Sequence, residues 1–413
     1  MKISVIADCH LNKVNFSSFK DKESGTPYKS HDFMKAFKYM IDLNITDIKP
    51  DLLVIAGDIF DTYDPSNDVR AFFNEQLSRL VEQKIPVIVL VGNHDICKKN
   101  HALSPIAKIN VKSIKVVEEP KLIHFKGHVL LLYPYSLSVE RSIISQRNLF
   151  AKFAEESKKK IAENKDLQNK PILFFGHFGV KGAKLNAGLS SSGKQMNFKN
   201  ASSHDITMND LDSIGADYVF LGDYHEHQIL PTNNCIAMYT GSVERDDITQ
   251  RAQPKGFLLY DTEHPHAPDY GKVKFIEYPN CRPMISLSGS VKEIQAGIDK
   301  LTDEDKGAAV RIVYIGDRKG LNEFSLSIDG MRHEIRQKVQ PVHIFDSQNV
   351  IDTEVEEKGR KLEQDIVERG HMSEDEVVEV VNDIIKDLVE ESEVEILQKM
   401  AGEIRKEAKE ISQ

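Results

Sequence analysis

The 413-residue sequence has no tryptophan, only four cysteines, and no apolar run close to the roughly 18 residues that a membrane-spanning helix requires. The cysteines show neither a pairing pattern nor C-x-x-C spacing, which is typical of a protein in a reducing compartment. Met1 and Lys2 lead directly into a predicted strand, so we expect no signal peptide. These absences argue against a membrane protein and against a secreted disulfide scaffold, and they favour a cytoplasmic location.

An excess of positive charge is missing as well. The formal net charge is −10, and no long Lys/Arg stripe with interleaved aromatics is present. The acidity is concentrated in residues 351–413, which hold 20 Asp and Glu against 9 Lys and Arg, so the first 350 residues carry a net charge of +1. The main part of the chain can therefore bind DNA through local patches, although its composition does not demonstrate such binding.

What the sequence does contain is a set of five short motifs in which Asp, Asn or His directly follows an apolar run. The runs are short and rich in β-branched or aromatic residues, which predicts strands of a sheet that is covered on both faces. Ligands bind beyond the carboxyl ends of such strands, so polar residues that follow different strands can meet there. The predicted strands are Ile3–Ala7, Leu52–Ala56, Val87–Val91, Ile172–Phe175 and Tyr218–Leu221. The motifs are Asp8-Cys9-His10, Gly57-Asp58-Ile59-Phe60-Asp61, Gly92-Asn93-His94-Asp95, Gly176-His177 and Gly222-Asp223-Tyr224-His225.

Each motif taken alone has an ordinary structural explanation. An Asp after a strand often caps a helix, Asn-His before Asp suits a turn, and a lone His is commonly a structural residue. Five such motifs in order are hard to explain in that way, and together they favour a two-metal phosphoesterase. The donors are imidazoles, carboxylates and one amide oxygen, which suit Mn²⁺, Fe²⁺ or Zn²⁺ better than a metal that selects thiolates.

At these motifs the chain resembles the calcineurin-like metallophosphoesterases, whose signature is D-x-H, G-D-x-x-D, G-N-H-[DE], G-H and G-H-x-H. Four motifs match fully, whereas the first His of the last motif is replaced by Asp223. Within that superfamily the chain is most similar to nuclease subunits of the Mre11/SbcD type. That likeness rests on G-D-[IL]-F-D, on Gly-Asn-His-Asp, and on the Y-x-G-S-x-x-R and K-G-F segments at residues 239–245 and 255–257. It covers residues 1–262 well and the remainder only in general plan.

The resemblance implies a set of metal ligands and a catalytic residue. It gives one metal to Asp8, His10 and His225, and the second metal to Asn93, His177 and Asp223. Asp58 would bridge two cations that clamp the attacking and leaving oxygens of an in-line phosphoryl displacement.

His94 would then be left to stabilise the phosphorane-like charge and to protonate the departing 3′ oxygen. The alternative for His94 is an outer residue that merely orients Asp95 or a ligand. Asp61 and Asp95 are interpreted as carboxylates that fix His tautomers or loop backbone.

The departure at Asp223 bears on the metal. A carboxylate in place of an imidazole adds negative charge, which favours two Mn²⁺ ions, with Mg²⁺ or Fe²⁺ as alternatives, over Zn²⁺. His227 is a second candidate for the missing imidazole, because residues i and i+2 share one face of a strand.

The whole chain is predicted to be an α/β protein in three parts. Residues 1–268 form a metallophosphoesterase β-sandwich flanked by helices, including His31–Asp42 and Val69–Gln83. Asp261–Tyr270 is interpreted as a linker. Residues 269–346 then form a small α+β unit where related nucleases carry a DNA-capping domain, with strands at Lys272–Glu277, Pro283–Leu287, Ala308–Ile315 and Pro341–Phe345 and helices at Val291–Leu301 and Leu321–Arg336.

Residues 347–413 are predicted to form two acidic amphipathic helices. A capping box at Ser373 and Glu376 opens the first helix, and apolar stripes mark both. The stripes either pack on their own domain or, as the resemblance implies, dock on the coiled-coil base of an SMC-like ATPase subunit of the Rad50/SbcC type.

The leading functional hypothesis is a Mn²⁺-dependent DNA exonuclease and endonuclease that acts with this ATPase in double-strand break repair or recombination, as a homodimer. The alternatives are a general phosphodiesterase or phosphatase and a weakly catalytic DNA-end-binding scaffold. An acid-free segment from Gly179 to Asn200 separates two of the motifs, and its lysines are candidate phosphate contacts. A solvated loop without a partner explains that segment equally well. The lysines are Lys181, Lys184, Lys194 and Lys199.

Overall fold

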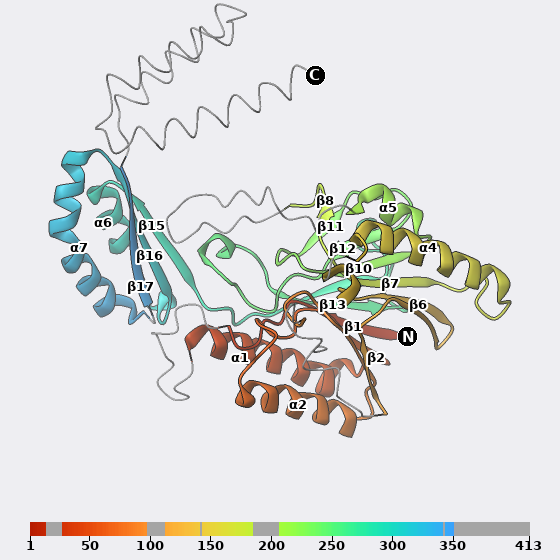
Figure 1. The fold of residues 1–413 in the computed structure, drawn as a ribbon. Helices are drawn as coiled ribbons and strands as arrows, with labels where there is room; N and C mark the ends of the chain where they lie inside the picture. Colours follow the sequence, from red (N-terminus) through yellow and green to blue (C-terminus); the bar gives the residue numbers. More distant parts are fainter. Residues whose placement is uncertain (14–26, 97–111, 141–142, 185–205, 342, 351–413) are drawn as a thin grey trace, which may run out of the picture. The chain divides into compact units, whose positions relative to one another are not determined.

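The computed structural model describes residues 1–13, 27–96, 112–140, 143–184, 206–341 and 343–350. The described residues fall into two compact units: the first lies within 1–286, 301–311 and 335–345, and the second within 287–300, 312–334 and 346–350. All five motifs lie in the first unit. Its centre is a pair of six-stranded sheets with helices on their outer sides (Figure 1). Among the described helices, none combines the length and the apolar character that a membrane crossing requires.

The first sheet has the order β14-β13-β1-β2-β3-β4. Strands β1 to β4 run parallel, and β13 and β14 continue the sheet in antiparallel pairs. This arrangement places the carboxyl ends of β1, β2 and β3 side by side. The strands are β1 (Lys2–Ile6), β2 (Leu52–Ala56), β3 (Val87–Leu90), β4 (Ile114–Val117), β13 (Gly256–Asp261) and β14 (Val273–Glu277).

The second sheet has the order β11-β12-β10-β7-β6-β5. Its four middle strands are parallel, and in their register Gly222 pairs with His177, so the fourth and fifth motifs are neighbours. The strands are β5 (Lys121–Phe125), β6 (His128–Tyr133), β7 (Ile172–His177), β10 (Tyr218–Gly222), β11 (Gln228–Leu230) and β12 (Ile236–Tyr239). A two-stranded sheet of β8 (Val180–Lys181) and β9 (Ile206–Thr207) follows β7.

Alternating side chains of the strands build three layers of core. Residues such as Val5 and Val54 pack between the sheets against Leu132 and Phe175. The opposite face of the first sheet packs on α1 (Tyr28–Leu43) and α2 (Asn67–Glu82), which contribute residues such as Phe37 and Phe73. The second sheet is covered by α4 (Gln146–Glu163) and α5 (Met208–Ser213). The predicted β-sandwich flanked by helices is therefore confirmed, and short helical turns complete the unit at α3 (Leu137–Glu140), η1 (Asn44–Ile48), η2 (Ile248–Gln250) and η3 (Asp303–Asp305).

Beyond β14 the chain forms a three-stranded sheet, β15-β16-β17, and two helices. The elements are β15 (Met284–Gly289), α6 (Val291–Asp299), β16 (Ala309–Gly316), α7 (Arg318–Val339) and β17 (His343–Val350). A complete capping box at Ser290 and Glu293 begins α6. Phe324 of α7 stacks on Tyr314 of β16 at a ring distance of 5.2 Å. The predicted strands and helices of this region are present, with boundaries shifted by a few residues.

One expectation about organisation is wrong. The strand predicted over 272–277 is expected in the small α+β unit, but β14 pairs with β13 at the edge of the first sheet. The segment Asp261–Tyr270, interpreted as a linker between domains, joins these two paired strands of one sheet. Local composition does not reveal pairing across a sheet, which is why the pattern misleads here. The division of the chain at 268 and 346 stays a prediction, and the helices predicted after residue 350 lie outside the described residues.

Candidate metal centre

The candidate site lies where parallel strands of both sheets end. Asp8, Asp58 and Asn93 follow β1, β2 and β3 of the first sheet, whereas His177 ends β7 and Asp223 follows β10 of the second sheet. Because parallel strands carry their carboxyl ends to one edge, five segments that are distant in sequence converge there.

The backbone of these segments is strained in a consistent way. Four residues of the motifs have positive φ angles, a region that side chains other than glycine rarely adopt. Such strain persists only where the surrounding structure enforces it, and it is common at functional sites. The angles are 51° at Asp8, 39° at His10, 50° at Asp58 and 101° at Asp223.

Glycines in the motifs allow the loops to approach closely. A Cβ atom on Gly92 would lie 2.1 Å from the Asp58 carboxylate, and one on Gly57 would lie 2.1 Å from the His177 ring. The φ of +89° at Gly57 adds a second reason for glycine at that position. Packing therefore requires a glycine before Asp58 and before Asn93, and at Gly57 the turn requires it as well.

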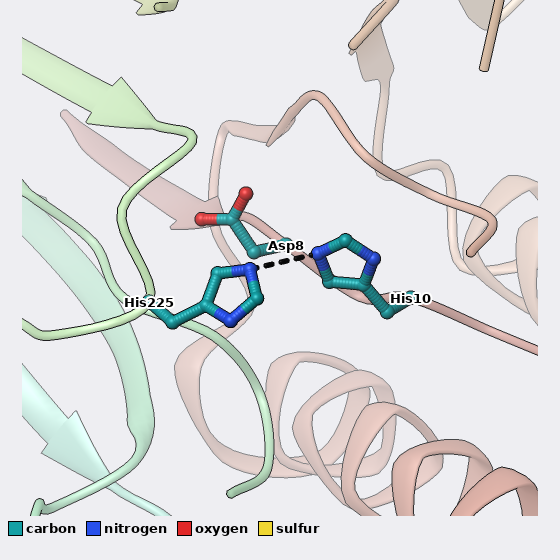
Figure 2. Close-up of side chains that lie close together, drawn as sticks. All are labelled: Asp8, His10 and His225. Carbon is teal, nitrogen blue, oxygen red and sulfur yellow. Dashed lines mark hydrogen bonds between the residues drawn. The ribbon is translucent and has the colours of Figure 1, made fainter. Parts of the chain in front are cut away.

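Asp8, His10 and His225 form one candidate cluster, with ligand atoms within 4.8 Å of one another. Figure 2 shows the two rings turned toward each other beside the carboxylate, and the His10 Nε2 to His225 Nε2 distance is 2.9 Å. Asp8 and His10 are fully buried, and Asp8 Oδ2 has no hydrogen-bond partner among the described residues. A buried carboxylate oxygen without a donor, next to two facing imidazoles, suits a cation.

Asp58 lies between this cluster and a second group of imidazoles. Its Oδ1 is 3.3 Å from His177 Nε2, and its Oδ2 is 3.7 Å from His10 Nε2. His94 Nε2 lies 4.0 Å from Oδ2. Two further candidate clusters therefore share this carboxylate: His10, Asp58 and His94, and Asp8, Asp58 and His177. Both clusters contain Asp58, which is the bridging ligand that the family resemblance implies.

Asn93 and Asp223 lie on the His177 side of the site. The Asn93 side-chain oxygen is 3.0 Å from His177 Nε2, and the Asp223 backbone N–H donates to Asp8 Oδ1 at 3.0 Å. Asn93 and Asp223 also line one cavity of about 150 Å³. Asp223 is a member of none of the three clusters described above.

His94 is the most accessible histidine of the centre. Its side chain is 41% exposed, whereas those of His10 and His177 are buried. Its Nδ1 donates to the Asp61 carbonyl oxygen at 2.8 Å, which directs the other ring nitrogen toward the site. The ring stands edge-on to His10 at a centroid distance of 4.9 Å.

Asp61 and Asp95 support the site from outside. The Asp61 carboxylate lies 3.3 Å from His10 Nδ1, on the side of the ring opposite to His225. Asp95 is fully buried and accepts three backbone N–H groups, from Gly92 at 2.9 Å, from Phe60 at 3.1 Å and from Ile59 at 3.3 Å. Asp95 thus ties the loop after β3 to the loop after β2.

The titratable groups of the site differ in the direction of their pKa shifts. Burial raises the pKa of Asp8 to about 7, against the lowering effect of His177. Burial also acts to raise the pKa of Asp58, but His177 outweighs it and holds that pKa below its usual value. Burial lowers the pKa of His225 far below its usual value and that of His10 to a smaller extent. Neutral imidazoles and an ionised central carboxylate are the forms that bind a divalent cation.

His227 does not supply the missing imidazole. Its Nδ1 lies 2.7 Å from the Tyr239 carbonyl oxygen and its Nε2 lies 3.1 Å from the Tyr270 hydroxyl. The ring also stacks on Phe275 at 4.2 Å. Both nitrogens are therefore engaged away from the centre, and that alternative is wrong because long-range partners hold the ring.

Of the four candidate phosphate-contacting lysines, Lys181 and Lys184 lie within the described residues. Lys181 is exposed at the end of β8, and the Lys184 backbone N–H donates to the Gln228 side chain at 2.9 Å. Lys194 and Lys199 lie outside the described residues.

Sequence reasoning missed three charged residues of the centre. Lys13 contacts Asp61 at 2.8 Å and Asp246 at 3.3 Å, and Asp246 faces His225 Nδ1 at 4.0 Å. The buried Lys255 ammonium donates to the His225 carbonyl oxygen at 2.7 Å. Only two of the three carried a local signal, because Asp246 directly follows the Y-x-G-S-x-x-R segment and Lys255 opens K-G-F.

Comparison with known proteins agrees with this geometry. The family model described as calcineurin-like phosphoesterase matches residues 1–227. The D component of the nuclease SbcCD from Staphylococcus epidermidis is 26% identical over 275 residues, which are 64% of this chain and 67% of that protein. The Escherichia coli protein of the same name is 23% identical over 82% of this chain and 81% of its own length. The DNA double-strand break repair protein Mre11 of Sulfurisphaera tokodaii is 28% identical over 38% of each chain. Because the family model covers more than half of the chain, this protein belongs to the calcineurin-like phosphoesterase family.

Proposed function

We propose that this phosphoesterase is a DNA nuclease that hydrolyses phosphodiester bonds with two divalent cations, most favourably Mn²⁺. The observation that carries the proposal is the convergence of imidazoles on both sides of Asp58, with the exposed His94 beside them. The names of the relatives, a nuclease component and a DNA break repair protein, supply the substrate class.

The residues divide into two proposed groups around the bridging Asp58. Asp8, His10 and His225 would hold one cation, and Asn93, His177 and Asp223 would hold the other. When bound, such cations supply Lewis-acid stabilisation of the phosphate and lower the pKa of water. The neutral state of His10 and His225 prepares the first group for this role, because a protonated imidazole cannot bind a metal.

His94 is proposed to act on the substrate. Its Nδ1 is held by the Asp61 carbonyl oxygen, so its exposed Nε2 can donate a proton to the departing 3′ oxygen. The neighbouring carboxylates counter burial and raise its pKa, Asp58 most strongly, which favours the protonated form that a general acid needs.

The preference for Mn²⁺ over Zn²⁺ is proposed from Asp223. Carboxylate and amide oxygens suit Mn²⁺ or Mg²⁺, whereas an imidazole at that position would suit Zn²⁺ better. Asp223 and Asn93 line the same cavity of about 150 Å³, so two residues that carry oxygen donors border one space.

We further propose that the chain works in a complex, as the name of the relatives, one subunit of a nuclease, suggests for them. An SMC-like ATPase of the Rad50/SbcC type would bind the helices predicted after residue 347, two copies of the chain would dimerise, and the complex would act in double-strand break repair or recombination. The capping role proposed for residues 269–346 and the phosphate contacts proposed for Lys181 and Lys184 belong to the same hypothesis.

One observation favours a second candidate, a weakly catalytic DNA-end-binding scaffold. Asp223 replaces the family's imidazole and joins none of the three clusters. If the second proposed metal site, which includes Asp223, binds no cation, DNA binding would persist while cleavage would be slow. Metal stoichiometry separates the two candidates, because the nuclease requires two cations and a scaffold tolerates one.

The test is Mn²⁺-dependent digestion of end-labelled duplex DNA, compared with hydrolysis of para-nitrophenyl phosphate esters. We expect the wild type to degrade DNA and His94→Ser to bind Mn²⁺ normally while losing about 100-fold or more in rate, as general acid catalysis contributes about that much. His266→Ser, at an exposed histidine in the β13–β14 loop, is the matched control. Cleavage of the small esters alone would refute the DNA assignment.

A further inference from the structure

Two carboxylates face the outer nitrogens of the imidazoles in the first candidate cluster. His10 and His225 turn their Nε2 atoms toward each other at 2.9 Å. On the far sides of the rings, Asp61 lies 3.3 Å from His10 Nδ1 and Asp246 lies 4.0 Å from His225 Nδ1. Outer carboxylates commonly orient metal-binding imidazoles. Here Asp61 comes close to hydrogen-bonding distance of His10, whereas Asp246 acts on His225 through its charge.

One ammonium group joins these two carboxylates. Lys13 Nζ lies 2.8 Å from Asp61 Oδ1 and 3.3 Å from Asp246 Oδ2, and the Lys13 side chain is only 8% exposed. The contacts thus run in a chain from His10 through Asp61, Lys13 and Asp246 to His225. Four separate segments, after β1, β2, β10 and β12, contribute to it.

Backbone hydrogen bonds hold two segments of this chain of contacts next to each other. The Leu11 N–H donates to the Ile59 carbonyl oxygen, and the Asp61 N–H donates to the Leu11 carbonyl oxygen, both at 2.9 Å. These bonds fix the loop after β1 against the loop after β2, so the Lys13 and Asp61 side chains start from adjacent positions. The Asp246 carboxylate arrives from a segment more than 180 residues away in sequence, which makes the lysine the link between distant parts.

We propose that Lys13 is a positioning residue for metal binding, because its ammonium clamps Asp61 and Asp246 and thereby orients both imidazoles of the first cluster. This inference rests on the proposed two-metal function. Lys13 itself contacts neither a cation nor the substrate, and it acts only through the two carboxylates.

The charge balance explains why a lysine suits this place. Two partly buried carboxylates close together repel each other unless a cation lies between them, and the Asp61 and Asp246 side chains are only 11% and 19% exposed. Burial acts to lower the pKa of Lys13, but Asp246 and Asp61 outweigh it and raise that pKa, so the ammonium stays charged. With one positive charge between two negative charges, Asp61, Lys13 and Asp246 together carry a net charge of −1, which still attracts a divalent cation.

An ordinary structural ion pair is the competing explanation, and it makes a different prediction. Removal of a structural pair would lower the free energy of unfolding of the metal-free chain and leave metal affinity unchanged. Removal of a clamp lowers metal affinity even when the metal-free chain is equally stable. Metal affinity measured together with metal-free thermal stability therefore separates the two explanations.

The experiment is a titration of the metal-free, full-length chain with Mn²⁺ alone, followed by electron paramagnetic resonance, and with Co²⁺, followed by visible absorption. We expect Lys13→Met to weaken one of two sites by about 10- to 100-fold and to alter the Co²⁺ spectrum. Lys13→Arg, which keeps the charge and the donors, should restore much of the affinity. Lys38→Met, which removes an exposed pair with Asp42, is the matched control and should bind like the wild type.

A double-mutant cycle tests the route of the effect. If the lysine acts through Asp246, the losses in Lys13→Met and Asp246→Asn should not add in the double variant. Additive losses, or an unchanged affinity in a stable Lys13→Met, would overturn the clamp while the nuclease proposal stands. If Lys13→Met does not fold, Lys13→Gln provides the same comparison. A wild type that binds no Mn²⁺ would overturn both proposals.

Discussion

Among single residues, Asp58 has the greatest influence on the candidate centre. It is buried, it adopts a φ of 50°, and three imidazoles approach its oxygens within 4.0 Å. The Asp61 carboxylate, by contrast, lies on the outer side of His10 and contacts Lys13. The two aspartates of one motif therefore differ in the effect that their removal should have.

We predict that Asp58→Asn abolishes Mn²⁺ binding at both positions, because the amide removes the charge that two cations would share. Asp61→Asn should weaken binding by only about 10- to 100-fold, as expected for an outer partner of a ligand. Isothermal titration calorimetry measures both effects. Equal losses in the two variants would contradict the bridging role.

Asp223 gives a second prediction at the residue scale. Asp223→His restores the family's imidazole and removes one negative charge, so the Zn²⁺ to Mn²⁺ affinity ratio should rise by about tenfold, which corresponds to about 1.4 kcal/mol. Competition between the two metals, with bound metal measured after desalting, provides the ratio. An unchanged ratio would mean that Asp223 is not a ligand.

At the scale of elements, the loops that follow the strands are shaped by glycine, whereas one glycine of α7, Gly330, has no such role. A Cβ on Gly92 would collide with Asp58, and Gly241 has a φ of +82° with its Cβ position 2.8 Å from the His227 backbone nitrogen. Gly330 of α7 is exposed, and a Cβ there would meet nothing within 4 Å. The same residue type is thus required in one element and replaceable in another.

We predict that Gly330→Ala raises the free energy of unfolding by about 0.5–1 kcal/mol, because alanine has the higher helix propensity and the site is open. Gly92→Ala should lower it by about 1–3 kcal/mol through overpacking against Asp58. Urea denaturation with both variants gives the two values. A destabilised Gly330→Ala would show that α7 is packed on that side.

For the molecule as a whole, the proposed centre would couple folding to metal binding. The unfolded chain cannot assemble candidate ligands from segments as distant as Asp8 and His225, so a cation would bind the folded state alone. His177 Nε2 lies 3.3 Å from Asp58 Oδ1, and that carboxylate raises the pKa of His177 against the effect of burial, so His177 balances the charge of Asp58. A bound cation would take over this role from a proton.

We therefore predict that Mn²⁺ stabilises the protein by mass action, by about 2.7 kcal/mol at 100 times its dissociation constant. Thermal unfolding should occur at a higher temperature with Mn²⁺ than with a chelator present. Asp58→Asn should show no such shift, and a shift of equal size in that variant would indicate binding elsewhere.

The sequence by itself determined the strands and the polar residues that follow them. Apolar runs before Asp8, Asp58 and Asn93 predicted strands of a sheet covered on both faces, and polar residues beyond the carboxyl ends of such strands can meet. This inference needs only local hydrophobicity and order along the chain, so it predicted both the sandwich and the place of the candidate centre.

Only the tertiary structure decided which side chains surround that centre. It placed β14 in the first sheet, engaged His227 with Tyr239 and Tyr270, and brought Lys13 and Asp246 together. Each of these outcomes depends on contacts between residues far apart in the chain, which local pattern does not encode. The candidate ligands that follow the strands can therefore be recognised in the sequence. The residues that surround them, such as Lys13 and Asp246, are brought there only by tertiary packing.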